Sequence, residues 1–262
     1  MKGLISLIFL VSTLFASNNR WSSHSAYIVE KGRWELGLFQ PLRYGYTNTS
    51  EFSIYPGWFF LMPNIEIKES QMSVWGFTTA SQYRLIYPTP LLNVLSRKGI
   101  GGVIAPEHKI PTMFSFTGTL IGSKKIGRFD LTLSGGLDIG IVLGELNPLS
   151  TIDLPLVYHR LGVFYNGWGM HSGFDIQTAI SRRIEVLLDS DILFLPGLDG
   201  EYSLENKFLI SWNKSNNFRI MMGYKVVLGE FPYGEDIRIL PYLPVLERWV
   251  PILELQWGRD KK

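Results

Sequence analysis

Charged side chains recur at alternate positions inside long, otherwise apolar segments of this chain. A spacing of two residues places successive side chains on the same face of a β-strand, so these charges would line one face of a sheet. Acidic and basic groups on such a face can pair and fill an interior, or line a water-filled path whose selectivity follows their sign and spacing. The candidate residues for this face are Glu35, Arg43, Arg84, Asp130, Asp138, Asp175, Glu185, Asp189, Asp191, Glu205, Lys207, Arg219, Lys225 and Glu254.

The segment Phe129–Leu143 shows the alternation most clearly. Its odd positions carry Phe, Leu, Ile and one Gly, while its even positions carry mainly Asp, Thr, Ser and Gly. A strand in an ordinary soluble sheet runs about five or six residues, so a strand of this length needs an unusually wide apolar environment on one side. We expect a lipid bilayer on the outer face and a polar lumen on the inner face.

Similar alternating segments, separated by turn-forming clusters, continue from residue 33 to the end of the chain. We expect strands at 33–46, 51–60, 75–87, 111–122, 129–143, 152–165, 168–180, 184–194, 202–212, 218–228 and 250–258. The pair Asn166-Gly167 predicts a two-residue hairpin turn, and the proline-containing stretches 87–111 and 231–251 are expected to be long loops or rim structure.

The number of strands follows from the need to close the sheet. An open sheet edge in hydrocarbon leaves backbone groups unpaired at several kcal/mol each. Single-chain bacterial barrels have an even number of strands, so a twelfth is expected in 93–105 or 237–246, with ten strands as the alternative. The sequence therefore predicts an all-β fold, a closed antiparallel transmembrane β-barrel of about 12 strands.

The amino-acid composition limits the cellular compartments and the kinds of chemistry that are compatible with the chain. Charged residues make up 18% of the 262 residues, below the roughly 25% of average soluble domains. The net charge of +2 does not indicate nucleic-acid binding, and the lack of cysteine excludes disulfides, thiolate metal sites and cysteine nucleophiles. Lys2 and the apolar run 4–15 predict a signal peptide over 1–17, followed by a periplasmic segment at 18–32 and the barrel at 33–262.

Taken together, the signal peptide, the alternating strands and the last strand resemble a bacterial outer-membrane β-barrel protein. The stretch Ile252-Leu253-Glu254-Leu255-Gln256-Trp257 is similar to the C-terminal assembly signal of that class, which ends in an aromatic residue. The resemblance implies a location in the bacterial outer membrane, contact with outer-membrane lipid, and insertion by the barrel-assembly machinery. It covers nearly the whole mature chain and implies no particular activity.

The lumen residues leave three classes of function open. A barrel of about twelve strands lies between the filled eight-strand size and the open sixteen-strand size. We expect a narrow passive channel for small polar solutes, with a plugged structural or anchoring barrel as the alternative and a barrel-type outer-membrane hydrolase as a third class. No cofactor is expected.

Catalytic and metal sites are not expected from the sequence. The neighbours His24-Ser25 and His171-Ser172 would point to opposite faces of a strand, although a histidine could still meet a serine or aspartate of another strand. Acidic residues 185, 189 and 191 share a face and could hold calcium, but no loop with metal-ligand spacing accompanies them. Pairing with Lys207 and Arg219, or simple solvation, is the expected role of these acids.

Overall fold

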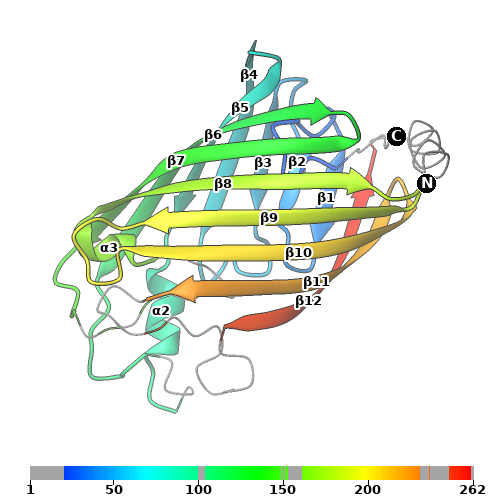
Figure 1. The fold of residues 1–262 in the computed structure, drawn as a ribbon. Coiled ribbons are helices and arrows are strands. Elements are labelled where there is room, and N and C mark those ends of the chain that lie inside the picture. The colour runs from blue at the N-terminus through cyan, green and yellow to red at the C-terminus, as the bar shows by residue number, and fades with distance from the viewer. Residues whose placement is uncertain are drawn as a thin grey trace.

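The described residues form a closed β-barrel. The computed structural model describes residues 21–99, 104–148, 150, 152, 161–230, 236 and 248–260. Each strand pairs antiparallel with its neighbours in sequence, and β1 pairs with β12 to close the ring of twelve strands (Figure 1). The predicted closed antiparallel all-β barrel and its strand number are confirmed. The predicted signal peptide, residues 1–17, lies outside the described residues.

The strands differ greatly in length. The three short strands are β1 (Trp34–Gly37), β2 (Leu42–Gly45) and β3 (Ser50–Ile54). The longer ones are β4 (Asn64–Val74), β5 (Phe77–Ile86), β6 (Thr112–Ile126), β7 (Phe129–Leu143), β8 (Trp168–Ala179), β9 (Ile184–Phe194), β10 (Tyr202–Ser215), β11 (Phe218–Gly229) and β12 (Trp249–Arg259). In the part of the chain that the structure describes, two short helices, α2 (Thr89–Leu95) and α3 (Val163–Asn166), lie in loops.

Several strand predictions were wrong although the total was right. The expected strand 33–46 is two strands, β1 and β2, and β4 was not predicted because its outer face turns polar after Ile67. Within the described part of 152–165, the chain forms α3, and Gly167 ends that helix with φ 86° instead of making a hairpin turn. Residues 93–95 belong to α2, while 237–246 lie outside the described residues. Pro251, where the expected loop 231–251 and the expected strand 250–258 overlap, pairs with Tyr224 inside β12.

The two ends of the barrel are built differently. At one end, here called the turn end, short connections join β4 to β5, β6 to β7, β8 to β9 and β10 to β11. Trp34 pairs with Arg259 at this end, so β1 begins there and β12 ends there. The opposite end, here called the loop end, carries the connections 55–63, 87–111, 144–167, 195–201 and 230–248, including both helices (Figure 1).

An apolar cluster covers part of the loop end. Residues from the connection with α2, from the connection with α3, from the start of β6 and from the start of the β9–β10 connection pack together there. The buried members are Leu92, Ile104, Ile110, Met113, Ile152, Leu161, Val163, Phe164 and Leu195. The loops at this end therefore pack on one another, unlike the short turns at the opposite end.

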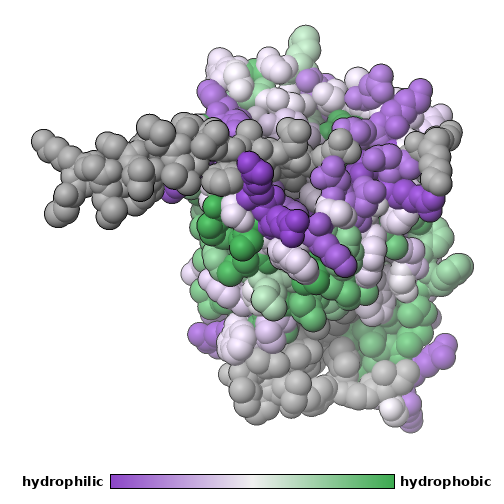
Figure 2. Space-filling view, turned by 90° about the vertical axis from the view of Figure 1, so that its right-hand side faces the viewer, coloured by the Kyte–Doolittle hydropathy of each residue, from purple (hydrophilic) through white to green (hydrophobic). Residues whose placement is uncertain are grey.

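The burial pattern of the barrel is the reverse of that of a soluble protein. Large apolar side chains point outward along the strands, as with Leu120 at 70% and Leu137 at 53% exposure. Charged side chains point inward, and Glu35 and Glu254 are 0% and 2% exposed. Hydrophobic residues (green) reach the surface in broad patches in Figure 2, which views the molecule from the right-hand side of Figure 1. Among the described residues, no helix is long and apolar enough to cross a membrane.

Candidate functional site

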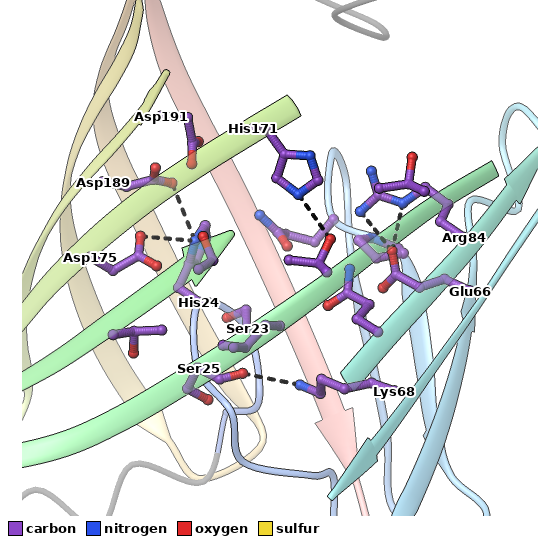
Figure 3. Close-up of a pocket in the computed structure, with 18 of the residues that line it drawn as sticks. Ser23, His24, Ser25, Glu66, Lys68, Arg84, His171, Asp175, Asp189 and Asp191 are labelled. Atoms are coloured by element: carbon purple, nitrogen blue, oxygen red, sulfur yellow. Dashed lines mark hydrogen bonds and ion pairs between the residues drawn. The ribbon is translucent and has the colours of Figure 1, made fainter. Parts of the chain in front are cut away.

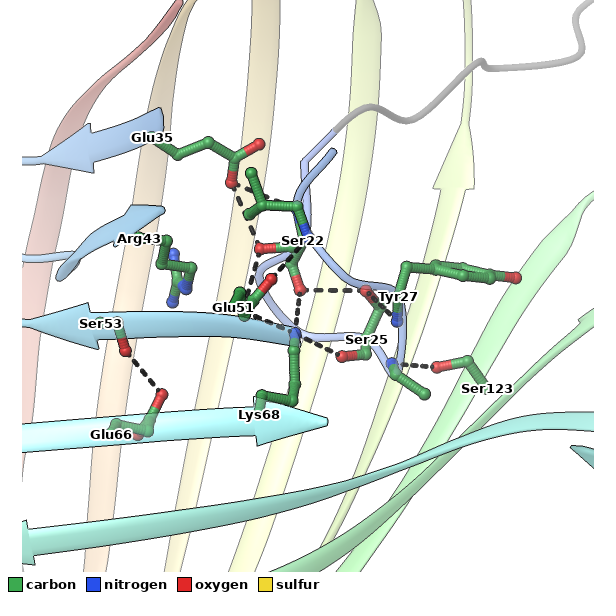
Figure 4. Close-up of polar contacts among 12 residues, drawn as sticks. Ser22, Ser25, Tyr27, Glu35, Arg43, Glu51, Ser53, Glu66, Lys68 and Ser123 are labelled. Atoms are coloured by element: carbon green, nitrogen blue, oxygen red, sulfur yellow. Dashed lines mark hydrogen bonds and ion pairs between the residues drawn. The ribbon is translucent and has the colours of Figure 1, made fainter. Parts of the chain in front are cut away.

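The residues that precede β1 lie inside the barrel. Residues 21–32, here called the inner segment, contact side chains of the inner wall (Figure 4). Within this segment, Ala26 and Val29 are 0% and 1% exposed. The backbone N–H of Ala26 donates to Ser123 Oγ at 2.8 Å, and that of Val29 donates to Glu51 Oε2 at 2.6 Å. The segment that the sequence analysis placed in the periplasm thus occupies, over its described part, the lumen near the turn end.

Trp21 anchors the start of the inner segment. Its side chain is 4% exposed, and two guanidinium groups lie over its ring system, with Arg219 Cζ 4.6 Å and Arg33 Cζ 5.2 Å from a ring centroid. Cations over an aromatic face attract it electrostatically, and more strongly when both are removed from water. Arg219 also donates to Ser23 Oγ at 2.8 Å. Both arginines are almost fully buried, so the inner segment contributes partners to charges of the barrel interior.

A second group of contacts holds the middle of the inner segment. Lys68 Nζ forms an ion pair with Glu51 Oε1 at 3.0 Å and donates to the carbonyl oxygens of Ser22 and Ser25, each at 3.3 Å. Glu35 Oε2 accepts from the backbone N–H of Ser22 at 3.3 Å (Figure 4). Buried charges of the wall are thereby satisfied partly by the backbone of the inner segment, as buried ions require.

Gly45 lets the inner segment approach the wall closely. The carbonyl oxygen of Gly45 accepts from the N–H of Gly32 at 2.8 Å, and its own N–H donates to the carbonyl oxygen of Arg33 at 3.0 Å. A Cβ atom at position 45 would overlap the carbonyl oxygens of Val29 and Glu30. Any larger residue at this position therefore has to displace the inner segment or bend β2.

A polar cavity of about 320 Å³ lies between the inner segment and the loop end. Arg43, Lys68 and Arg84 line it from β2, β4 and β5. Asp175, Asp189 and Asp191 line it from β8 and β9, and the two groups lie on opposite sides of the view in Figure 3, where Arg84 and Lys68 are labelled. Leu161, Val163 and Leu193 contribute apolar surface from the loop end.

The acidic wall is only partly neutralised. Lys207 Nζ lies 2.5 Å from Asp189 Oδ2, so the expected pairing with Lys207 is present. His24 Nδ1 of the inner segment lies 3.3 Å from the same oxygen and 3.7 Å from Asp175 Oδ1. Burial, together with the Lys207 ammonium, lowers the pKa of His24 to about 4, although Asp189 opposes the shift. The imidazole is therefore neutral near pH 7.

The same cluster also has the spacing of a cation site. His24, Asp175 and Asp189 offer ligand atoms within 4.8 Å of one another, a spacing that a metal ion can bridge. The ammonium of Lys207 already lies against the shared oxygen of Asp189, however, and it supplies the positive charge that a metal would bring. The geometry therefore favours an ion pair at this position.

A further polar group lines the cavity wall on β6, β7 and β8. His171 Nδ1 lies 2.8 Å from Asp138 Oδ2, and His171 Nε2 lies 2.9 Å from Thr119 Oγ1. Thr117 Oγ1 donates to the other oxygen of Asp138 at 2.6 Å. Gly136 makes room for the ring, since a Cβ there would lie 2.7 Å from His171 Nε2. Carboxylate, imidazole and hydroxyl follow in the order used for general-base activation of a nucleophile.

The predicted lumen residues separate into two sets. Arg43, Arg84, Asp138, Asp175, Asp189, Asp191 and Lys207 line the cavity. The other predicted residues do not line the cavity. Glu205 forms an ion pair with Lys225 at 2.9 Å, Glu185 accepts a hydrogen bond from Gln177, and Arg219 donates one to Gln256. Glu254 accepts from the backbone N–H groups of Leu38 and Phe39, Glu35 accepts from Arg33, and Asp130 lies just after the β6–β7 turn. Of the acids expected to pair with Lys207 and Arg219, Asp189 pairs with Lys207, and Glu185 interacts electrostatically with Arg219.

Sequence reasoning missed some residues of the site. Lys68 and Glu66 lie on β4, the strand that was not predicted, and Glu66 pairs there with Arg84 at 2.6 Å. Ser22, Ser23 and His24 belong to the inner segment, where no periodic pattern marks a contact with the wall. A run of small hydroxyl residues directly before a barrel was the only available signal.

Comparison with known proteins does not add a family to this description. No protein-family model matches the chain, and no curated protein resembles it at a significant level. What the structure establishes is a closed antiparallel barrel with charged residues inside and apolar residues outside.

Proposed function

We propose that the chain is a bacterial outer-membrane β-barrel that provides a narrow path for small polar solutes. The observation that carries the proposal is the reversed burial: apolar side chains such as Leu133 and Leu253 are 46% and 55% exposed, while charges are buried inside. In water such an outer face would be an association hazard, whereas in hydrocarbon it is the favourable arrangement.

The asymmetry of the two ends supports an orientation. Outer-membrane barrels have short turns on the periplasmic side and longer loops outside the cell. The turn end, where β1 begins and β12 ends, would then face the periplasm, and the loop end would face the exterior. Export directed by the expected signal peptide would deliver the chain to the periplasm, which agrees with an inner segment that enters the barrel from the periplasmic side.

The inner segment restricts the path. It fills the lumen near the turn end and contacts Glu51, Lys68 and Ser123 of the wall. The cavity of about 320 Å³ behind it has room for one small solute. Passage through the barrel therefore requires the inner segment to move, and we place the gate of the channel there.

A barrel that stays closed is the second candidate function. The contacts of Trp21 with Arg219 and Arg33, together with the apolar cluster at the loop end, favour it. Such a protein would have a structural or anchoring role. The two candidates share the fold and the membrane, and they differ in whether the inner segment leaves its place.

A hydrolase is less well supported. His171 reaches Asp138 and Thr119, but the backbone N–H groups around them belong to the paired strands β6, β7 and β8. Acyl transfer needs free donors for the developing oxyanion, and paired strands do not offer them. We assign these side chains to the polar lining of the cavity.

Conductance across a planar lipid bilayer tests the proposal. The purified full-length protein is compared with Gly45→Val, which removes the space for the backbone of Val29 and Glu30. Trp212→Ala, at an exposed outer position, is the matched control for assembly. We expect brief, small ionic steps from the wild type and from the control, and longer or larger steps from Gly45→Val.

The alternative outcomes are distinct. No steps from the wild type or from a correctly folded Gly45→Val barrel would contradict the channel and leave the closed barrel. Folding is read from the shift in gel migration between unheated and boiled samples. Equal conductance in the wild type and Gly45→Val would contradict the inner segment as the gate.

A further inference from the structure

The cavity has walls of opposite charge on opposite sides of the barrel. Arg43 lies on β2 and Asp175 on β8, and these two strands are six steps apart in either direction around the ring of twelve. Strands six steps apart in such a ring face each other across its diameter. Both side chains line the same cavity, so a positive group and a negative group lie on opposite sides of it.

On the positive wall, one charge is left over after pairing. Lys68 pairs with Glu51 at 3.0 Å and Arg84 pairs with Glu66 at 2.6 Å. Arg43 donates from Nη2 to the neutral side chain of Gln40 at 2.9 Å, and no carboxylate of the described residues lies within ion-pair distance of it. Its Nη1 is buried without a hydrogen-bond partner among the described residues. A guanidinium nitrogen that is buried without a partner carries a desolvation cost that an anionic group could offset.

On the negative wall, the acids outnumber the bases. Asp175, Asp189 and Asp191 face one ammonium, that of Lys207, which lies against Asp189. Asp175 Oδ1 is buried without a hydrogen bond within the described part of the chain, and so is Nε2 of the neighbouring His24. Asp175 and His24 both line the cavity, and Asp175 lies on β8, across the ring from Arg43 on β2, which leaves this wall able to accept a cationic group.

We propose that the cavity is a binding site for a small zwitterion, whose carboxylate is held by Arg43 and whose ammonium is held by Asp175. This inference rests on the proposed function and names the class of solute that the path admits. Opposed charges in a confined site create a field across it, which aligns a dipolar solute and adds to both contacts. A solute with one charge pairs with the charged group of one wall and leaves the charged group of the other wall desolvated and unpaired. In this way a site rejects an analogue that lacks one of the polar groups.

The volume supports a solute of modest size. A cavity of about 320 Å³ is at the lower end of small-molecule sites. Because the two walls face each other, the charges of the solute should lie at separate ends of the molecule. An amino acid with its ammonium at the far end of a short chain meets this requirement, and we use 5-aminopentanoate as the probe.

Calorimetric titration of the full-length protein in detergent is the test. The probes are 5-aminopentanoate, pentanoate, which lacks the ammonium, and pentylamine, which lacks the carboxylate. We expect 5-aminopentanoate to bind at least about tenfold more tightly than either analogue, because each lost charge-assisted contact corresponds to about that factor or more. Equal affinity for the three probes, or no detectable binding of 5-aminopentanoate, would overturn the proposal.

Two variants test which wall of the cavity binds which charge of the solute. Arg43→Gln should lower the affinity for 5-aminopentanoate and pentanoate at least about tenfold while leaving pentylamine unchanged, and Arg43→Lys should restore part of the loss. Asp175→Asn should lower the affinity for 5-aminopentanoate and pentylamine and leave pentanoate unchanged. Arg97→Gln, at an exposed position near the end of α2, is the control and should change nothing. Equal loss for all three probes in both wall variants, with folded barrels, would contradict the assignment.

Binding and flux are measured separately, so the two proposals can fail separately. Conductance without selective binding of 5-aminopentanoate refutes the zwitterion site and keeps the channel. Selective binding without conductance in any variant supports the site and refutes the channel. The comparison of probes on the wild type needs no substitution, so it holds even if Arg43→Gln fails to fold.

Discussion

Arginine at an outward position of β7 should destabilise the barrel according to its depth in the membrane. Leu133 and Leu143 have the same side chain, lie on the same face of the same strand, and are 46% and 62% exposed. Leu133→Arg and Leu143→Arg are therefore a matched pair. In a soluble barrel both would be surface substitutions, each within about 0.5 kcal/mol of the wild type.

The depth of each position follows from the strand geometry. Phe129 opens β7 near the turn end, and Trp168, which pairs with Ile139, opens β8 near the loop end. The ten residue steps from Phe129 to Ile139 cover about 33 Å along the strand, or about 25 Å along the barrel axis at a tilt of about 40°. That height equals the apolar band of outer-membrane barrels, which aromatic residues flank.

The two leucines fall at different levels of this band. Its midplane lies near Ser134, so Leu133 is within about 3 Å of it, while Leu143 is about 23 Å away and outside the band. Arginine costs about 2 to 4 kcal/mol at the midplane and about 0 to 1 kcal/mol at the interface. We expect Leu133→Arg to lose about 2 to 4 kcal/mol and Leu143→Arg at most about 1 kcal/mol.

Urea unfolding of the barrel in lipid vesicles, followed by tryptophan fluorescence, measures both values. Gel migration with and without boiling gives an independent readout of the folded fraction. Equal free-energy losses at the two positions, or a loss confined to Leu143→Arg, would refute the placement of the band. Losses near zero for both variants would refute a lipid environment for this face altogether.

Three further predictions concern the interior. Lys207→Met should destabilise the barrel by about 3 kcal/mol, because it leaves Asp189 buried with its main partner removed; an unchanged urea midpoint would contradict this. Acid should loosen the inner segment: the pKa of His24 is lowered from 6.5 to about 4, so the docked segment loses stability as the pH falls below about 6.5, and proteolysis of the segment should accelerate towards pH 4. Asp175, Asp189, Lys207 and Arg43 surround this imidazole, and His24→Gln should abolish the pH response while retaining the fold. Finally, His171→Ala should leave conductance within about twofold of the wild type if the residue only lines the cavity, and a loss of any detectable ester hydrolysis would instead favour a catalytic role.

The sequence predicts the fold well because one physical cause acts along the whole chain. In the proposed membrane, outward positions meet a uniform environment, so the period of two in β7 and β11 can be recognised without knowledge of the neighbouring strands. The prediction failed in β4, because the outward positions after Ile67 carry the polar residues Glu69 and Gln71 and not apolar ones. It also failed at 33–46, where a break at 38–41 separates two strands of four residues.

Parts of the site also follow from local register. The expected strands 168–180 and 184–194 leave three residues between them, and the short connection sets Asp175 directly opposite Asp189. The inner segment is different, because its contacts with Glu51, Lys68 and Ser123 join residues far apart in the chain without a repeating pattern. Such contacts depend on the closed shape of the barrel, which the order of residues alone does not give.

The central claim is that the outer face of this barrel meets lipid and its inner face meets water. The chain contains no cysteine, so single cysteines can be placed at each position of Phe129–Leu143 and labelled with a nitroxide in vesicles. Odd positions should be accessible to dissolved oxygen with a maximum near Leu133, while even positions should be shielded from oxygen. Odd positions that are instead most accessible to a water-soluble relaxation reagent would contradict the account.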